Sequence, residues 1–239
     1  MRTVFVKILI EEARKDSNLF LLTADLGYRA LEEFQDEFPE RLINVGVAEQ
    51  NMIGVATGLA LSGKNVCVYS IVPFVTFRCF EQIRNNISHN NLNIKIIGVG
   101  GGFSYGDQGI SHNTTEDFAV MRTLPNFNIL CPGDKIEAEL VIKAMFNDAK
   151  PAYIRLGKAP NISVYESIPK FRIGEGLTVK EGHDITILSV GNIIENVIQV
   201  AKKLDEKGVS AQVISFPCIK PLNYEYIENI AKNMKIMCY

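Results

Sequence analysis

The feature that most constrains the fold of this chain is an alternation of short apolar runs with helical patterns. Apolar runs bounded by polar residues lie, for example, at 18–24, 65–72 and 92–99. Segments with apolar residues at helical spacing lie between such runs, and another, 2–15, opens the chain. Strands that are separated by helices form βαβ units, so the sequence predicts a parallel sheet in an α/β layer fold.

Two series of elements follow from this pattern. In the first series, strands are expected at 18–24, 41–45, 65–72, 92–99, 127–131 and 152–156, and helices at 2–15, 30–38, 49–62, 74–88, 116–123 and 134–148. Segment 157–183 contains prolines and glycines with weak periodicity, and we interpret it as a connector. A second series predicts strands at 184–190, 210–216 and 235–239 and helices at 193–207 and 224–232. Three strands and two helices are few for an independent core, so the second domain is expected to be minimal or incomplete.

Composition excludes several classes of function. The net charge is −2, which gives little electrostatic basis for binding nucleic acid or an acidic membrane. No run approaches the roughly 18–20 apolar residues of a membrane span, and the first residues lack a signal-peptide pattern. Five scattered cysteines without metal-ligand spacing are typical of reduced core cysteines, which predicts a cytoplasmic protein.

Ligand sites in parallel sheets lie at the carboxyl ends of the strands, so residues that follow strands are the first candidates. Glu49 follows a predicted strand and opens an almost wholly apolar helix. The helix dipole would stabilise its charge, whereas burial would raise the pKa of such a carboxyl group. A glutamate that only satisfies backbone amides at the start of the helix explains the pattern as well, and this alternative stays open here.

Three aromatic residues, Phe74, Phe77 and Phe80, repeat every third position, which places them along one side of a predicted helix start. Core packing explains such spacing, and a platform for a flat heterocycle is the alternative. A long glycine-rich segment, 100–113, ends near His112, and long loops in compact domains are usually functional or disordered. A loop histidine can also be a hydrogen-bonding bystander.

Several motifs in order resemble the pyrimidine-binding domain of the transketolase family. They are TADLG near the start, NVGVAEQNMIGVATGLALSG, YSIVPFVTFRCFEQIRN, GDQGISHNTTEDFAVMRTLPN and PAYIRLGK. The resemblance covers residues 1–160 and continues more weakly through 184–239, with 161–183 as a linker. It implies a parallel-sheet α/β domain that binds the pyrimidine of thiamine diphosphate, followed by a smaller, incomplete α/β C-terminal domain of the family.

The resemblance also implies how the cofactor is bound. The family's glutamate at the position of Glu49 bonds the aminopyrimidine nitrogen and favours the tautomer that deprotonates the thiazolium carbon. Phe74 would stack on the pyrimidine, with Phe77 and Phe80 lining the pocket. A shielded carboxylate near helix amides suits this role, while the cofactor supplies the carbanion chemistry.

Substrate contacts are implied as well. Asp25 matches an aspartate near the thiazolium and the substrate, and His112 matches a histidine that contacts sugar hydroxyls and helps to move protons. Arg2 and Arg155 match two arginines that grip the sugar phosphate, a use that suits the bidentate guanidinium.

Two departures from the family pattern concern the substrate. The family usually has Asp-Gly-x-Thr-His, whereas residues 108–112 are QGISH. Gln108, or the preceding Asp107, would therefore replace the aspartate that holds a substrate hydroxyl. The family's phosphate-facing histidine falls near Gly100, where this chain has only glycines, and Arg29 is the candidate that would compensate.

The largest departure is that no diphosphate-binding domain precedes the pyrimidine motifs. Such domains carry Gly-Asp-Gly and a downstream asparagine that hold Mg²⁺, and residues 106–109 (GDQG) do not match that motif. The resemblance thus implies a split enzyme in an α2β2-like assembly, with Mg²⁺ and diphosphate on an N-terminal partner subunit. We expect transfer of a two-carbon ketol unit between sugar phosphates.

Other functions remain open. They are a condensation with decarboxylation of pyruvate, as in 1-deoxyxylulose-5-phosphate synthase, a non-catalytic pairing subunit, and a plain nucleotide-binding α/β domain, although no phosphate loop is visible.

Overall fold

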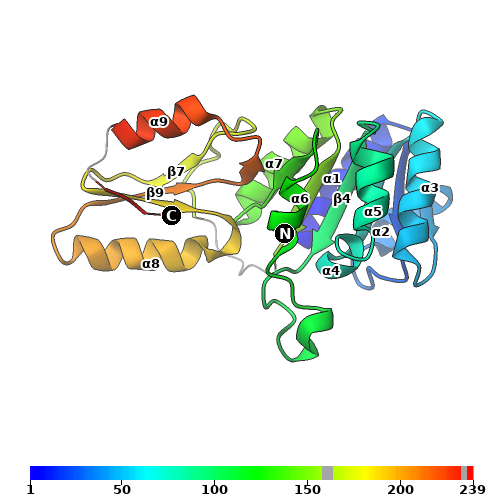
Figure 1. Cartoon of the computed structure of the whole chain (residues 1–239), viewed down its shortest axis with the longest axis horizontal. Helices are drawn as coiled ribbons and strands as arrows, with labels where there is room; N and C mark the ends of the chain where they lie inside the picture. The colour runs from blue at the N-terminus through cyan, green and yellow to red at the C-terminus, as the bar shows by residue number, and fades with distance from the viewer. Residues whose placement is uncertain (158–163, 233–235, 239) are drawn as a thin grey trace.

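The larger part of the molecule is a seven-stranded, mostly parallel sheet with helices on both faces (Figure 1). We describe it from a computed structural model that covers residues 1–157, 164–232 and 236–238. The strands of this first sheet are β1 (Leu19–Thr23), β2 (Leu42–Asn44), β3 (Asn65–Ile71), β4 (Ile94–Val99), β5 (Asn128–Leu130), β6 (Ala152–Leu156) and β10 (Cys218–Lys220). Their order is β10-β5-β6-β4-β3-β1-β2, and all pairs are parallel except β10 with β5. The predicted α/β fold is confirmed.

Alternate residues of each strand enter two separate cores. In β1, Leu21 packs into one hydrophobic cluster and Leu22 into the other. In β4, Ile97 and Ile96 divide in the same way. Successive side chains of a strand point to opposite faces, so a strand that is apolar throughout must be covered on both sides. This is why the short apolar runs occupy a central sheet.

Helices supply the other half of each core. The elements of this domain are α1 (Arg2–Lys15), α2 (Glu32–Glu37), α3 (Glu49–Leu61), α4 (Val72–Val75), α5 (Phe80–Gln82), α6 (Asp117–Arg122) and α7 (Lys135–Asn147), the 3-10 helices η1 (Pro39–Arg41) and η3 (Gly106–Ser111), and the π-helix η2 (Ile83–Ser88). Phe5 and Leu9 of α1 pack with Val141 of α7 in the first cluster. Met52 and Ile53 of α3 belong to the second.

The helix predicted over 74–88 is wrong as a single element. The structure breaks it into α4, a turn over 76–79, α5 and η2. The backbone NH groups of Phe77 and Arg78 both donate to the carbonyl of Pro73, at 3.1 and 3.4 Å, which opens the helical turn. The Cys79 thiol then donates to the Phe74 carbonyl at 3.3 Å. The break turns the Arg78 side chain toward α3.

The second sheet has four strands in the order β11-β8-β9-β7. They are β7 (Leu177–Lys180), β8 (Ile185–Ser189), β9 (Ala211–Ser215) and β11 (Ile236–Cys238), with η4 (Gly191–Ile193), α8 (Ile194–Asp205) and α9 (Tyr224–Lys232) beside them. Figure 1 shows α8 and α9 on opposite faces of this sheet. Strand β7 lies inside the segment 157–183 that we interpreted as a connector, and it pairs antiparallel with β9. The second domain therefore begins earlier than its first predicted strand.

Contacts join the two domains at the β5 side of the first sheet. Strand β10 crosses from the second domain to pair with β5, and the Cys131 NH donates to the Pro217 carbonyl at 2.8 Å. Glu137, buried near the start of α7, accepts a hydrogen bond from the Tyr165 hydroxyl at 2.6 Å. Burial raises the pKa of Glu137, and the bond from Tyr165 opposes that rise. No helix in the part of the chain that the structure describes is long and apolar enough to cross a membrane.

Candidate functional site

The carboxyl edge of the first sheet gathers four of the predicted site residues. Asp25 follows β1, Glu49 opens α3 after β2, Phe74 lies in α4 after β3, and His112 lies in the long segment after β4. Because β1 to β4 run parallel and lie next to one another, their carboxyl ends meet at one edge. The topology therefore brings together residues that are far apart in the sequence.

Asn44, which the sequence motifs did not single out, ties two of these loops together. Its side-chain carbonyl accepts hydrogen bonds from the backbone NH of Asp25 at 2.9 Å and of Gly46 at 3.0 Å. Asp25 has a φ of 54°, a conformation that costs energy for a residue other than glycine. The Asn44 bond helps to hold it there. An asparagine at a strand end before a glycine is a weak signal for such a clamp.

Glu49 is almost completely buried, with 1% of its surface exposed. Its Oε2 accepts a hydrogen bond from Nη1 of Arg78 at 2.5 Å, which is also an ion pair. This carboxylate is thus bonded by a side chain that lies outside its own helix. A buried carboxylate needs such a partner, because an unpaired charge away from water is costly.

Arg78 also lies over an aromatic ring. Its Cζ atom is 4.5 Å from the centroid of the Phe74 ring, a cation–π contact. The His112 ring meets Phe74 edge-on at 5.0 Å, and the Tyr105 ring meets His112 at 5.7 Å. Glu49, Arg78, Phe74, His112 and Tyr105 therefore form one continuous row of side chains. Arg78 was missed from the sequence, although a lone arginine inside an apolar segment was a usable signal.

The other two phenylalanines do not share this row as predicted. Phe77 lies in the turn between α4 and α5 and is 38% exposed. Phe80 packs against the core cluster on the α3 side of the sheet. The expectation that Phe74, Phe77 and Phe80 line one side of a helix is wrong, because the helix breaks between them. Their assignment to a cofactor pocket stays a prediction.

Cys79, next to Arg78 in the chain, is held as a neutral thiol. Burial raises the pKa of this thiol to about 12, and the negative charge of Glu49 adds to that shift. At ordinary pH it is therefore a poor nucleophile. Its thiol donates a hydrogen bond to the Phe74 carbonyl.

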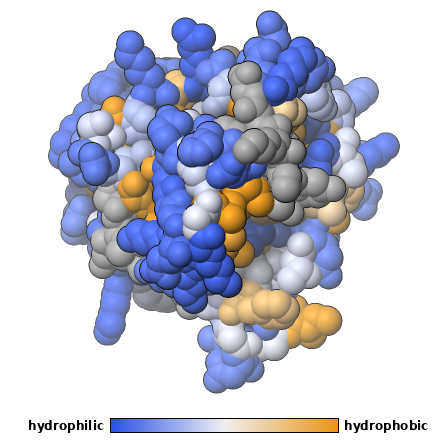
Figure 2. All heavy atoms as spheres, turned by 90° about the vertical axis from the view of Figure 1, so that its left-hand side faces the viewer, coloured by the Kyte–Doolittle hydropathy of each residue, from blue (hydrophilic) through white to orange (hydrophobic). Residues whose placement is uncertain are grey.

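The segment between β4 and α6, residues 100–116, projects from the domain (Figure 1), and we call it the projecting segment. Gly102 and Thr114 close its base with two backbone hydrogen bonds. Phe103 is 76% exposed and Ile110 is 96% exposed on it. Figure 2 shows apolar surface at this lower end of the molecule. The two candidates for a substrate hydroxyl, Asp107 and Gln108, are exposed on the same segment.

Only glycine fits at position 100 without a steric clash. A Cβ there would lie 2.3 Å from Cε2 of Tyr105, and Gly100 has a φ of 85°. Tyr105 covers the position that the family resemblance associates with a histidine. A side chain at position 100 would displace Tyr105 and, with it, the ring next to His112.

Two of the three predicted phosphate-binding arginines lie together. Arg2 and Arg29 line one pocket of about 390 Å³. Arg2 also lies beside Tyr69 and Tyr105. Burial raises the pKa of Tyr69 to about 12, and the charge and hydrogen bond of Arg2 oppose that rise.

Arg155 does not line the pocket that Arg2 and Arg29 share, and its side chain is 17% exposed. Its Nη1 is 3.0 Å from Oδ1 of the fully buried Asp117, and its Cζ lies 4.4 Å from the ring centroid of Phe118. Burial raises the pKa of Asp117, and the charge of Arg155 opposes that shift. A phosphate role for Arg155 stays a prediction, and it would have to compete with Asp117.

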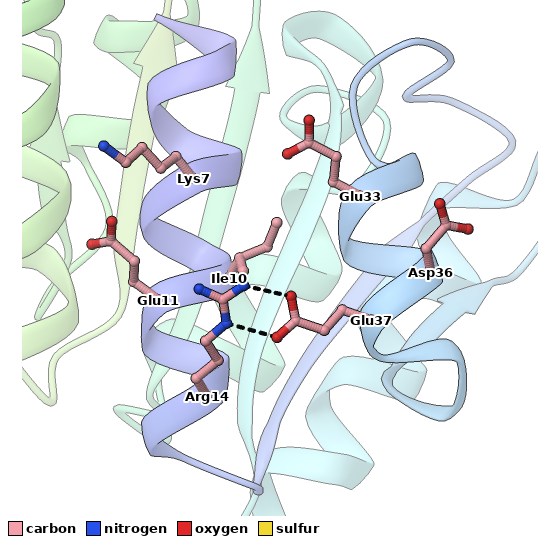
Figure 3. Close-up of a pocket in the computed structure, with 7 residues that line it drawn as sticks. All are labelled: Lys7, Ile10, Glu11, Arg14, Glu33, Asp36 and Glu37. Atoms are coloured by element: carbon pink, nitrogen blue, oxygen red, sulfur yellow. Dashed lines mark hydrogen bonds and ion pairs between the residues drawn. The ribbon is translucent and has the colours of Figure 1, made fainter.

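A pocket of about 570 Å³ between α1 and α2 contains none of the predicted site residues. Six of the seven side chains that line it are charged, and an Arg14–Glu37 pair closes one side (Figure 3). Among the residues that the structure describes, no group of three or more His, Cys, Asp or Glu side chains could hold a metal ion.

Comparison with known proteins decides the family. The family model for the transketolase pyrimidine binding domain matches residues 1–160, and the model for the transketolase C-terminal domain matches residues 174–238. The chain belongs to the transketolase family. The predicted resemblance is confirmed, and the chain corresponds to the C-terminal section of split transketolases.

Individual relatives support this assignment. A putative transketolase C-terminal section from Methanocaldococcus jannaschii is 38% identical over 95% of this chain and 73% of its own length. One subunit of an apulose-4-phosphate transketolase from Phocaeicola vulgatus is 35% identical over 97% of this chain and 75% of its own length. A solved split-gene transketolase, described as an inactive β4 tetramer, superposes with a TM-score of 0.89 at 33% identity. The match covers 99% of this chain and 77% of that one.

Proposed function

We propose that this chain is the pyrimidine-binding subunit of a thiamine-diphosphate-dependent transketolase. The assembled enzyme would transfer a two-carbon ketol unit between sugar phosphates, with the cofactor held between this chain and a separate diphosphate-binding subunit. The single observation that carries the proposal is a nearly buried Glu49 carboxylate that Arg78 joins to the ring face of Phe74. Both stand at the carboxyl edge of the sheet, where ligands of this fold class bind.

The residues present fit the cofactor. The guanidinium of Arg78 already lies on the Phe74 ring and donates to Glu49. Glu49 and Phe74 can therefore hold a flat, nitrogen-containing group that stacks on Phe74 and donates a hydrogen bond to Glu49. An aminopyrimidine is such a group. Glu49 and Phe74 would hold that ring, with Phe77 and Phe80 nearby, while Mg²⁺ and the diphosphate would be bound by the partner.

The cofactor, when bound, supplies the carbanion chemistry. Glu49 would hold the proton that it shares with the aminopyrimidine nitrogen, in a site from which the protein excludes water. His112, fixed between the rings of Phe74 and Tyr105, would take or give a proton at a substrate hydroxyl. Asp25 would orient the substrate beside it.

Substrate selection would rest on polar and basic groups around this edge. Gln108 and Asp107 are exposed on the projecting segment and would contact a sugar hydroxyl. Arg2 and Arg29, which line one pocket, would bind the phosphate, with Arg155 as the third candidate. Relatives named for apulose-4-phosphate and 6-deoxy-6-sulfo-D-fructose support a sugar substrate without fixing which one.

The partner would be an N-terminal transketolase subunit in an α2β2-like assembly. The relative named as one subunit of an apulose-4-phosphate transketolase implies a second subunit, and the similar split-gene chain is described as an inactive β4 tetramer. We therefore expect this chain alone to bind the cofactor poorly and to show no turnover.

The test is to purify the chain gently from its own cells and to identify what accompanies it by mass spectrometry. A stoichiometric partner with Gly-Asp-Gly and a downstream asparagine is expected, and the complex should transfer a ketol unit from a ketose phosphate to an aldose phosphate. Glu49→Gln in the complex should lower turnover at least about a hundredfold, the lower range for a lost acid–base group. Unchanged turnover in that variant would contradict the role of Glu49.

The same assay distinguishes a second reaction. The chain is 32% identical over 98% of its length to 1-deoxy-D-xylulose-5-phosphate synthase from Bacillus cereus, of which it covers 38%. Consumption of pyruvate with release of CO₂, in place of a ketose phosphate, would favour that condensation. A complex that forms but consumes neither donor would favour a non-catalytic pairing subunit.

A further inference from the structure

Arg78 makes two contacts at once, and both are contacts that the proposed function assigns to the cofactor. Its Nη1 donates to Glu49 Oε2 at 2.5 Å, and its Cζ lies 4.5 Å above the Phe74 ring. The guanidinium is flat and carries nitrogen donors in its plane. An aminopyrimidine that stacks on Phe74 and bonds Glu49 would need the same space.

A second side chain also contacts the Phe74 ring. The His112 ring meets Phe74 edge-on, with 5.0 Å between the ring centroids, and the Tyr105 ring centroid lies 5.7 Å from that of His112. Two flat groups cannot both lie over the same ring face and bond the same carboxylate oxygen. A cofactor that uses this face of Phe74 and this oxygen of Glu49 therefore requires the Arg78 side chain to leave.

The backbone of Arg78 is held, whereas its side chain has a route out. The Gln50 side-chain amide donates to the Arg78 carbonyl at 3.0 Å, and the Arg78 NH donates to the Pro73 carbonyl. The Arg78 side chain is 43% exposed, while that of Glu49 is 2% exposed. The guanidinium can turn into water by side-chain rotation alone, but Glu49 stays buried and needs a replacement partner.

We propose that Arg78 is a removable occupant of the pyrimidine site. In the cofactor-free chain its guanidinium compensates the Glu49 charge and covers Phe74, and the cofactor takes over both contacts when it displaces the arginine. The inference rests on the proposed function, since it assumes that an aminopyrimidine binds at Glu49 and Phe74. It adds a gating residue to that site.

A protein whose binding-competent state is only partly populated shows an affinity reduced by that fraction. Removing the occupant should therefore tighten cofactor binding. Arg78→Ala should lower the apparent Kd for thiamine diphosphate by about tenfold, as expected when roughly one molecule in ten is open. Arg78→Lys keeps a charge but loses the flat stack, so its Kd should fall between those of the wild type and the alanine variant.

The experiment uses the complex copurified from the protein's own cells, stripped of cofactor, with thiamine diphosphate and Mg²⁺ as the probe. Titration calorimetry gives the Kd, and stopped-flow fluorescence gives the association rate. Arg84→Ala is the matched control, since Arg84 lies in η2, six residues further along the same broken helix. Its guanidinium donates to the exposed side chain of its neighbour Asn85 at 2.8 Å. This control should leave both quantities unchanged.

Thermal unfolding provides a readout that a purely structural arginine would not give. Without cofactor, Arg78→Ala should lower the Tm, because Glu49 is left buried and unpaired. At saturating cofactor, the difference from the wild type should disappear. If Arg78 instead stays in place as a structural partner of Glu49, the Tm difference would persist with cofactor bound.

The outcomes separate the two proposals. A wild-type complex that binds no thiamine diphosphate would overturn the proposed function and this inference together. A wild-type complex that binds it, while Arg78→Ala and Arg78→Lys bind equally or more weakly, would overturn the inference alone. Should the alanine variant fail to fold, the lysine variant decides by the same measure.

Discussion

Arg155 and Asp117 form an ion pair inside the first domain, with Nη1 of Arg155 3.0 Å from Oδ1 of the aspartate. Asp117 has no exposed surface and also accepts a hydrogen bond from the Tyr153 hydroxyl at 2.7 Å. The arginine that motif comparison assigns to a substrate phosphate is thus engaged with a buried carboxylate. The structural use and the phosphate use of Arg155 lead to different predictions.

Replacing Asp117 tests the structural use. Asp117→Ala should destabilise the chain by about 3 kcal/mol, because removal of one partner of a buried pair leaves the other charge uncompensated. Urea unfolding of the chain measures this. The double variant Asp117→Ala/Arg155→Met should lose clearly less stability than the sum of the losses of Asp117→Ala and Arg155→Met, because it removes both charges. Additive losses would show that the pair does not interact.

Replacing Arg155 tests the phosphate use in the assembled enzyme. If Arg155 also grips the substrate phosphate, Arg155→Met should raise KM for a sugar phosphate by at least about tenfold, the equivalent of one lost charged hydrogen bond. KM for the unphosphorylated sugar should be unchanged. Equal effects on both substrates would leave Arg155 with the structural role alone.

Replacing Asn44 tests the hydrogen bonds that join two loops of the candidate site. Its side-chain carbonyl accepts from Asp25 and Gly46, so Asn44→Ala should free both loops while leaving the buried core intact. We expect cofactor affinity of the complex to fall by about tenfold, and the Tm to fall by only a few degrees. Asn44→Asp keeps an acceptor oxygen and should retain most of the affinity. Equal losses in both variants would rule out the hydrogen-bond explanation.

Much of the fold could be predicted from the sequence, because apolar runs report burial directly. The strand around Leu21 and Leu22 is apolar on both faces, which only a covered sheet explains. Strand β10 was not found because it is three residues long and follows a proline. Strand β7 was missed because only its first residue is buried, so it carries no apolar run.

The sequence named candidate site residues but could not show the contacts between them. Motifs singled out Glu49, Phe74 and His112, whose roles stay predictions, and the structure brings Phe74 and His112 into contact. The partner of Glu49 could not be found, because it depends on a helix break that periodicity over 74–88 does not reveal. An arginine reaches Glu49 only because the turn at 76–79 redirects it.

Lys95 allows a prediction about pH. It is buried at the amino-terminal side of β4, and its Nζ donates to the carbonyls of Asp148 and Lys150 at 2.5 and 2.6 Å. Burial lowers the pKa of Lys95 from 10.5 to about 8, while Cys67 and Asp148 oppose the shift. The folded state then binds fewer protons than the unfolded state between pH 8 and 10.5. Below pH 8, the buried charge of Lys95 lowers the free energy of unfolding, and this destabilisation disappears as the pH rises.

The free energy of unfolding of the wild type, taken relative to that of Lys95→Met, should therefore rise by about 3 kcal/mol as the pH increases from the folded to the unfolded pKa of this lysine. Urea unfolding of both proteins at several pH values gives this difference, and the comparison cancels other groups that titrate at high pH. Lys143→Met is the control, because Lys143 is exposed and its pKa is raised by its bond to Glu139. A flat difference for Lys95→Met would contradict the buried, shifted lysine.

The projecting segment gives a prediction about assembly. Phe103 and Ile110 are 76% and 96% exposed on it, and the same segment carries His112, which contacts Phe74. Large apolar side chains in that position are typical of contacts that a partner covers. Because the proposed partner must complete the cofactor site over Phe74, it would lie against this segment. Phe103→Ser and Ile110→Ser should each weaken binding of the partner by about tenfold or more, as measured by titration calorimetry.

Both serine variants should leave the Tm of the chain itself unchanged, since neither side chain is buried in it. Ile168→Ser is the matched control, because Ile168 is 69% exposed outside the projecting segment. It should not affect partner binding. If all three variants bind the partner equally well, the projecting segment does not contribute to the interface. If Ile168→Ser weakens binding alone, the partner contacts the region around Ile168 instead, and it would have to reach the cofactor edge from that side.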